Sequence, residues 1–136
     1  MISISSAIDE NAGVANLVDG DDSTFWHVMF PTQEKEQWIR ISLPVPENVI
    51  ALGVLPRLDV QDQFWQSGSA EFQISNNGEN WRAIAKLGSR NRTDKVTHFQ
   101  YYIVQLDEFY KHYRILVKDK SFLSMGEISL YAASPD

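Results

Sequence analysis

The residues with the most evident chemistry form an acidic turn near the N-terminus, within residues 16–27. Asp19, Asp21, Asp22 and Thr24 surround Gly20, just before an aromatic pair. Hard cations such as Ca²⁺ take oxygen ligands from carboxylates, carbonyls and hydroxyls on a tightly turned backbone, and this segment supplies all three. It is not an EF-hand loop, because the spacing of the acids and the closing Glu are both missing. An acidic β-turn that caps its own backbone explains the same composition.

Groups suited to catalysis are scarce in this sequence. The chain has no cysteine, which excludes disulfides, thiol catalysis and Cys-based zinc sites. The three histidines His27, His98 and His112 have no metal-ligand spacing. A glycoside hydrolase needs two carboxylic acids across a cleft, whereas Asp59 and Asp62 lie on one predicted loop. We therefore expect the domain itself to be non-catalytic.

Length, composition and charge narrow the class of protein. The 136 residues fit one domain, and a hydrophobic content of 43% is enough for one core. The net charge of −6, from 18 acidic and 12 basic residues, argues against nucleic acid and anionic membrane as partners. No stretch approaches a membrane span, and the first residues lack the charged and apolar regions of a signal peptide. A targeting signal would lie upstream if this domain, residues 1–136, is a fragment of a larger secreted protein.

The elements that must position these groups are strands. Apolar and polar residues alternate over 37–43 and 70–75, and 48–55 is a nearly continuous apolar run. Asn77-Gly78 predicts a hairpin turn between 70–75 and 81–87. Further strands are predicted at 99–104, 113–117 and 127–131, and one helical turn at 106–111. Seven or eight short strands indicate an all-β sandwich or barrel, whose irregular segments 28–36 and 57–69 would gather at one end and carry binding.

Several segments in order resemble the discoidin family, which includes the C domains of coagulation factors V and VIII and the family-32 carbohydrate-binding modules. Residues 17–27 resemble its opening signature, an apolar pair, Asp-Gly, small polar residues, Thr, any residue and Trp. Residues 37–43, 52–57 and 72–81 resemble its W-I-x-I-x-L strand, its strand ending in Pro-Arg and its Asn-Gly hairpin. The last two strands match as well, so the resemblance covers almost the whole chain. It implies an antiparallel β-sandwich of the jelly-roll, galactose-binding-domain-like type.

The resemblance also implies one structural Ca²⁺ beneath the N-terminal turn. Carried over residue by residue, its ligands would be carbonyl and side-chain oxygens of Asn16, Asp19, Asp21, Thr24, Gly126 and Glu127. Glu127 begins the last predicted strand, and an acid there has little reason to point inward without a cation. We expect the ion to pin the first loop to the last strand and to take no part in chemistry.

Sugar-binding members of the family resemble this chain at His27 and Arg57. Their counterparts hydrogen-bond the hydroxyls of a terminal sugar, which suits a planar guanidinium and a ring with a donor and an acceptor. The apolar face of the sugar would stack on an aromatic ring, for which the candidates are Phe30, Phe64, Trp65 and Phe122. His27 as a structural histidine, Arg57 as a brace to Asp59 and Phe122 as a cap on the sandwich remain alternative interpretations. Ser67-Gly68 replaces the Asn-Gly of many galactose-binding relatives, so N-acetylhexosamines stay open.

The resemblance implies a carbohydrate-binding module for terminal galactose or N-acetylhexosamine sugars of extracellular glycans. Its setting would be extracellular, at a cell surface or periplasmic, where it targets a linked catalytic domain such as a hexosaminidase or sialidase. Two alternatives stay open. One is a discoidin domain that binds protein or inserts Phe64 and Trp65 into phospholipid, and the other is a structural domain that braces a neighbour.

Overall fold

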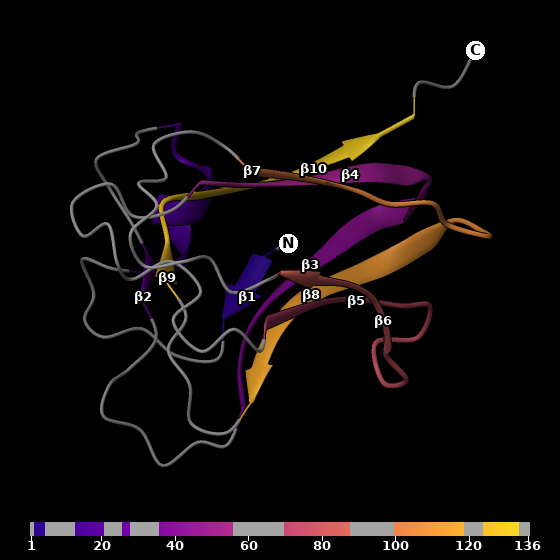
Figure 1. Ribbon diagram of the computed structural model, residues 1–136, viewed down its shortest axis with the longest axis horizontal. Coiled ribbons are helices and arrows are strands. Elements are labelled where there is room, and N and C mark those ends of the chain that lie inside the picture. Colours follow the sequence, from indigo (N-terminus) through magenta and orange to yellow (C-terminus); the bar gives the residue numbers. More distant parts are fainter. Residues whose placement is uncertain are drawn as a thin grey trace.

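The computed structural model describes residues 2–4, 13–20, 26–27, 36–55, 70–87, 100–118 and 124–133. These residues form ten strands and one short 3-10 helix (Figure 1). In chain order the elements are β1 (Ile2–Ile4), η2 (Val14–Val18), β2 (Trp26–His27), β3 (Glu36–Glu47), β4 (Val49–Leu55), β5 (Ala70–Ser75), β6 (Arg82–Leu87), β7 (Gln100–Ile103), β8 (Tyr110–Lys118), β9 (Ser124–Met125) and β10 (Glu127–Ala132). No described helix is long and apolar enough to cross a membrane.

Two antiparallel sheets make the layers of a β-sandwich, as the sequence predicts. One sheet has five strands in the order β1-β3-β8-β5-β6, and the other has three in the order β10-β4-β7. Figure 1 shows the two sheets as separate layers, with the short β2–β9 pair at one end. The β5–β6 turn and the β7–β8 connection lie at the opposite end of the sandwich (Figure 1). The fold therefore has two distinct ends, one with β2 and β9 and one with the β5–β6 hairpin turn.

The core lies between the two sheets and follows the alternation of the strands. Ile39 and Ile41 of β3 are buried, whereas the residue between them is more exposed. Ile115 of β8 belongs to the same core. β4 is buried along nearly its whole length, as its apolar run predicts for a strand covered on both faces. Leu17 of η2 and Trp26 of β2 are completely buried, so the N-terminal segment is anchored in the same core.

The helical turn predicted at 106–111 is absent, and β8 begins at Tyr110 instead. Tyr110 pairs with Glu47 of β3, and its ring is buried in the core. Its hydroxyl donates to the Asp107 carboxylate at 3.0 Å, which closes a bend before the strand. Tertiary pairing and burial of this ring outweigh the local preference for a helical turn, so that prediction is wrong.

β3 extends beyond the predicted end at residue 43, through Pro44 and Pro46 to Glu47. Proline has no N–H to donate, and the pairing with β8 shifts in register between Ser42 and Glu47. The strand continues past this irregularity because Glu47 pairs with β8 again. No sequence pattern indicates β1, β2 and β9, which have two or three residues each and are too short to show a period.

Candidate functional site

The N-terminal turn is tied directly to the last strand. The Gly20 amide donates to Oε1 of Glu127 at 2.9 Å, across 107 residues of chain. Glu127 is the first residue of β10 and is only 8% exposed. Gly20 adopts a φ of 72°, a left-handed conformation that glycine reaches without the strain of a Cβ. This backbone conformation gives the buried carboxylate one partner from the protein itself.

Four of the six predicted calcium ligands lie within the described residues and come from two adjoining segments. Asn16 lies in η2, and Asp19 is the C-terminal cap of this helix. η2 contacts β10. Gly126 immediately precedes β10, and Glu127 is its first residue. The Gly126 amide donates to the Leu55 carbonyl at 2.7 Å, which fixes the start of β10 beside the end of β4. Asp21 and Thr24 lie outside the described residues. The donors are oxygens throughout, the type that Ca²⁺ prefers. Within the described ranges no three His, Cys, Asp or Glu residues cluster, so carbonyls, Asp21 and Thr24 would have to complete the shell.

The strand ends that lead to the predicted sugar-binding residues converge at one end of the sandwich. In the β2–β9 pair, His27 lies opposite Ser124, two residues after Phe122. At the same end Leu55, the last residue of β4, pairs with Glu127. Arg57 follows Leu55 by two positions in the sequence. Phe30, Arg57, Trp65 and Phe122 themselves lie outside the described residues, as does the alternative ring Phe64. The backbone of His27 is described, and its role in sugar binding stays a prediction.

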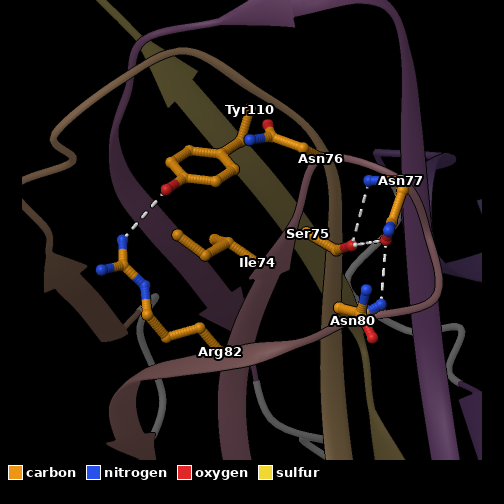
Figure 2. A pocket seen from close by; sticks show the side chains of 7 residues that line it. All are labelled: Ile74, Ser75, Asn76, Asn77, Asn80, Arg82 and Tyr110. Atoms are coloured by element: carbon orange, nitrogen blue, oxygen red, sulfur yellow. Dashed lines mark hydrogen bonds between the residues drawn. The ribbon is translucent and has the colours of Figure 1, made fainter.

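The opposite end of the sandwich carries a pocket of about 340 Å³ that sequence reasoning missed (Figure 2). It is lined by Ile74, Ser75, Asn76, Asn77, Asn80, Arg82 and Tyr110. The sequence explains the asparagines of this pocket as parts of a hairpin turn, but the turn needs the side chains of only some of them. The sequence signal that could have indicated the pocket is the presence of more asparagines than a turn requires. Three asparagines occur in five residues, and an arginine follows on the returning strand.

Ser75 and Asn77 hold the turn that forms one side of this pocket. The Ser75 hydroxyl accepts the Gly78 amide at 2.9 Å, and Oδ1 of Asn77 accepts the amides of Glu79 and Asn80 at 2.8 and 2.9 Å. Side-chain capping of this kind fixes a turn without help from a neighbouring element. The positions of the other asparagines therefore rest on a locally braced backbone.

Arg82 and Tyr110, which also line the pocket, form a network with Asp107 outside it. Nη2 of Arg82 lies 2.9 Å from Oδ1 of Asp107 and donates to the Tyr110 hydroxyl at 3.1 Å. Hydrogen bonds from the Tyr110 hydroxyl, from the backbone and from Arg82 hold the pKa of Asp107 below its ordinary value. Burial and the bond to Asp107 raise the pKa of Tyr110. Asp107 is therefore an anion and Tyr110 a neutral donor near pH 7.

The solvent side of the five-stranded sheet holds a second polar cluster behind the hairpin. Two guanidinium groups lie close to the Trp81 ring, with Cζ of Arg114 at 4.3 Å and Cζ of Arg40 at 5.5 Å from its centroid. Arg114 donates through Nε to Oε1 of Gln73 at 2.6 Å. Such stacked cations stabilise the position of the indole. The cluster braces the start of β6 against the middle of the sheet.

His112 belongs to this cluster and is poorly suited to acid–base chemistry. Its Nδ1 lies 2.9 Å from the Ser42 hydroxyl and 3.4 Å from Nη2 of Arg40. Burial, and then the charges of Arg40 and Lys111, lower its pKa. The imidazole is therefore neutral near pH 7. Ser42 and Arg40 engage Nδ1 of this ring, so the nitrogen has a structural role.

The outer face of the three-stranded sheet exposes a pair of tyrosines that no sequence motif singles out. Tyr101 of β7 and Tyr131 of β10 are 57% and 41% exposed, with ring centroids 5.9 Å apart. They pair with Gly53 and Ala51, two small residues of β4, the strand that lies between them. Periodicity places both tyrosines on the solvent side, which gives no reason to expect that they meet.

Comparison with known proteins gives the family. The model of the F5/8 type C domain matches residues 2–100. The chain belongs to this family. The match begins at β1 and covers the acidic turn, the Pro-Arg strand end and the hairpin. The search of curated proteins found no match.

Solved structures with the same fold cover this F5/8 type C domain almost completely. A module named CpGH89CBM32-5 from Clostridium perfringens, in complex with GalNAc-β-1,3-galactose, is 21% identical over 97% of this chain and 94% of its own, with a TM-score of 0.74. The family 32 module of C. perfringens NanJ, in complex with galactose, is 18% identical over 96% and 91%, with a TM-score of 0.71. The lectin domain of lectinolysin with Lewis B antigen is 16% identical over 98% and 93%, with a TM-score of 0.73. At these identities the likeness establishes the shared β-sandwich.

Proposed function

We propose that this F5/8 type C domain is a non-catalytic carbohydrate-binding module for terminal sugars, of the galactose or N-acetylhexosamine type, on extracellular glycans. The observation that carries the proposal is the meeting of three strand ends: β2 with His27, β4 two residues before Arg57, and β9 just after Phe122. A sugar bound there would meet a guanidinium, an imidazole and an aromatic ring from three separate segments. The solved neighbours whose printed names include a bound glycan support the same class of ligand.

The module would act by placing a linked catalytic domain, such as a secreted hexosaminidase, on its substrate. A shallow site on loops buries little surface, so affinity for a single sugar would be weak. A covalent link to a second glycan-active domain compensates because it raises the effective concentration of the sugar. We place this activity outside the cell, at the cell surface or in the periplasm.

Terminal-sugar recognition at this end of the domain is tested with a glycan array and the Arg57→Ala variant. The wild-type protein is expected to bind glycans that end in galactose or an N-acetylhexosamine. Removing the guanidinium deletes its hydrogen bonds and should weaken binding by about tenfold or more. Glu79→Gln, an exposed substitution in the hairpin turn, is the control and should bind as the wild type does. Equal binding by the wild type and Arg57→Ala would rule out this site.

We also propose that the module holds one structural Ca²⁺ between the N-terminal turn and the last strand. Asn16, Asp19 and Glu127 would contribute with Asp21, Thr24 and the Gly126 carbonyl. A carboxylate has several lone pairs, so Glu127 can accept the Gly20 amide and still reach a cation. The ion would neutralise a buried carboxylate and cross-link two segments far apart in the chain.

Calcium binding is tested by thermal unfolding with Ca²⁺ and with a chelator. At a hundred times its dissociation constant, Ca²⁺ adds about 2.7 kcal/mol to the free energy of unfolding, which is a rise of roughly 5–10 °C in Tm. Glu127→Gln keeps an acceptor for the Gly20 amide but loses the charge, so the Ca²⁺-dependent rise should shrink or vanish. Glu79→Gln should keep it. A wild-type Tm that is unaffected by Ca²⁺ would contradict the proposed site.

A further inference from the structure

The pocket at the hairpin end has the composition of a site for a small polar ligand. Ile74 and Tyr110 are 1% and 7% exposed, so they form an apolar floor that the core holds in place. Figure 2 shows both between Arg82 on one side and the asparagines on the other. A volume of about 340 Å³ is within the range of small-molecule sites and suits one sugar ring. An apolar floor with a few polar groups around it is the usual plan of such sites.

Hydrogen-bonding capacity remains around this floor after the turn and the network are satisfied. Asn80 gives only its backbone amide to the turn, and its side-chain amide has no protein partner in the described part of the chain. Asn76 donates from Nδ2 to Glu108, which leaves Oδ1 as an acceptor. The bonds of Arg82 to Asp107 and Tyr110 use Nη2, which leaves the donors on Nε and Nη1. Donors and acceptors side by side match hydroxyl groups, which do both.

The charges around the pocket select a neutral ligand. Arg82 is paired with Asp107, and Glu108 adds a second negative charge beside Asn76. Neither carboxylate lines the pocket, but with Arg82 neutralised by Asp107 a phosphate, sulfate or sialic acid would find no net positive charge there to offset the loss of its hydration. A neutral sugar suffers no such penalty, and its apolar face can lie on the floor.

We propose that this pocket is a second binding site for a neutral sugar residue, at the end of the sandwich opposite β2 and β9. The inference rests on the proposed function for the class of ligand, but the site shares no residue with the first. Two sites at opposite ends of one domain would let a single chain bridge two glycans or two branches of one glycan. Bridging raises the overall affinity through effective concentration, without any new contact at either site.

The site is tested on ¹⁵N-labelled protein by following its NMR signals during titration with free sugars. The probes are galactose, N-acetylgalactosamine, N-acetylglucosamine, mannose and fucose, with N-acetylneuraminic acid as the anionic comparison. The side-chain amides of Asn76 and Asn80 and the Nε–H of Arg82 should shift with at least one neutral sugar. They should not shift with the anionic one. Asn80→Ala keeps the backbone amide that the turn needs, and should weaken binding at the pocket about tenfold.

Two further variants separate this inference from the proposed function. Glu79→Gln lies in the same turn but does not line the pocket, so it should bind like the wild type. Arg57→Ala should weaken binding at the first site and leave the titration of the pocket signals unchanged, while Asn80→Ala should do the reverse. Shifts confined to the first site would overturn the second site alone, and shifts confined to the pocket would support it and overturn the first. No shift at the pocket with any neutral sugar overturns the inference.

Discussion

Tyr113 concentrates several stabilising interactions in one residue of the core. Its ring is completely buried and stacks on Phe72, with centroids 6.0 Å apart. Its hydroxyl donates to the Tyr110 carbonyl at 2.9 Å, with the Glu47 carbonyl at 3.3 Å. Tyr113 thus ties the start of β8 to the end of β3 near the irregular pairing at the two prolines. A buried polar group with such partners is costly to leave unsatisfied.

Tyr113→Phe removes the donor and leaves the Tyr110 carbonyl short of a partner. We expect the free energy of unfolding to fall by about 1–2 kcal/mol at pH 7, measured by urea unfolding. Burial, and then the charges of Glu47 and Tyr110, raise the pKa of Tyr113 to about 12.

The pH dependence of this stabilisation follows from the direction of the shift. The unfolded chain releases the Tyr113 proton near pH 10, while the folded protein keeps it to about pH 12. Its contribution is present below pH 10 and is lost as the pH rises to 12. Tyr113→Phe should therefore lose less stability than the wild type over that interval. Parallel curves for the two proteins would contradict the shift.

At the same scale, Glu127 shows what the type and position of a single residue can predict. The sequence marks it as an acid at the start of a strand, and the structure buries it against the Gly20 amide. Neither this amide nor the value of φ at Gly20 follows from composition. The pocket residues were missed for a related reason, since the type of an asparagine does not tell whether its side chain serves the turn or faces outward.

Among the elements, the β5–β6 hairpin depends on a glycine packed against another strand. Gly78 has a φ of 76°, and a Cβ there would overlap the guanidinium of Arg40. Arg40 is held by Ser42, His112 and the Trp81 ring, so it cannot move away without losing contacts. The Asn-Gly pair in the sequence predicts the turn, but only the fold shows that this glycine also makes room for β3.

Gly78→Ala and Gly20→Ala form a matched pair that separates backbone strain from packing. Gly20 has a similar φ of 72°, and a Cβ at this position would meet nothing within 4 Å, so its substitution should cost about 1 kcal/mol from strain alone. Gly78→Ala carries the same strain and must also displace Arg40, so it should cost about 1 kcal/mol more. Urea unfolding of both variants in the presence of a chelator measures the difference. Equal costs would show that Arg40 yields freely.

The elements also differ in whether the local sequence pattern predicts them. The strand at 70–75 is predicted to the residue, because its alternation ends at a strong turn signal. β2 and β9 have two residues each and exist through their pairing with each other, which a local pattern cannot reveal. The predicted turn of helix at 106–111 failed because Tyr110 pairs with Glu47, a residue far back in the chain.

At the scale of the whole molecule, the net charge bears on whether the domain would bind a glycan or a membrane surface. The fold alone does not choose between these two functions. A peripheral membrane protein gains about 1 kcal/mol for each Lys or Arg near an anionic surface, and this chain carries a net charge of −6. Its acidic character opposes approach to such a surface, while a neutral sugar is indifferent to it.

We therefore expect no co-sedimentation of the protein with vesicles that contain phosphatidylserine. Lowering the salt concentration lengthens the range of electrostatic repulsion and should reduce any residual binding further, whereas a cationic binder would gain affinity. Vesicles of phosphatidylcholine alone separate charge from apolar insertion. Binding to both lipids alike would point to insertion of an apolar surface, for which Tyr101, Tyr131 and Ile103, which is 79% exposed, offer one face. Binding to phosphatidylserine that strengthens at low salt would reverse the argument, because a local basic surface would then dominate the net charge.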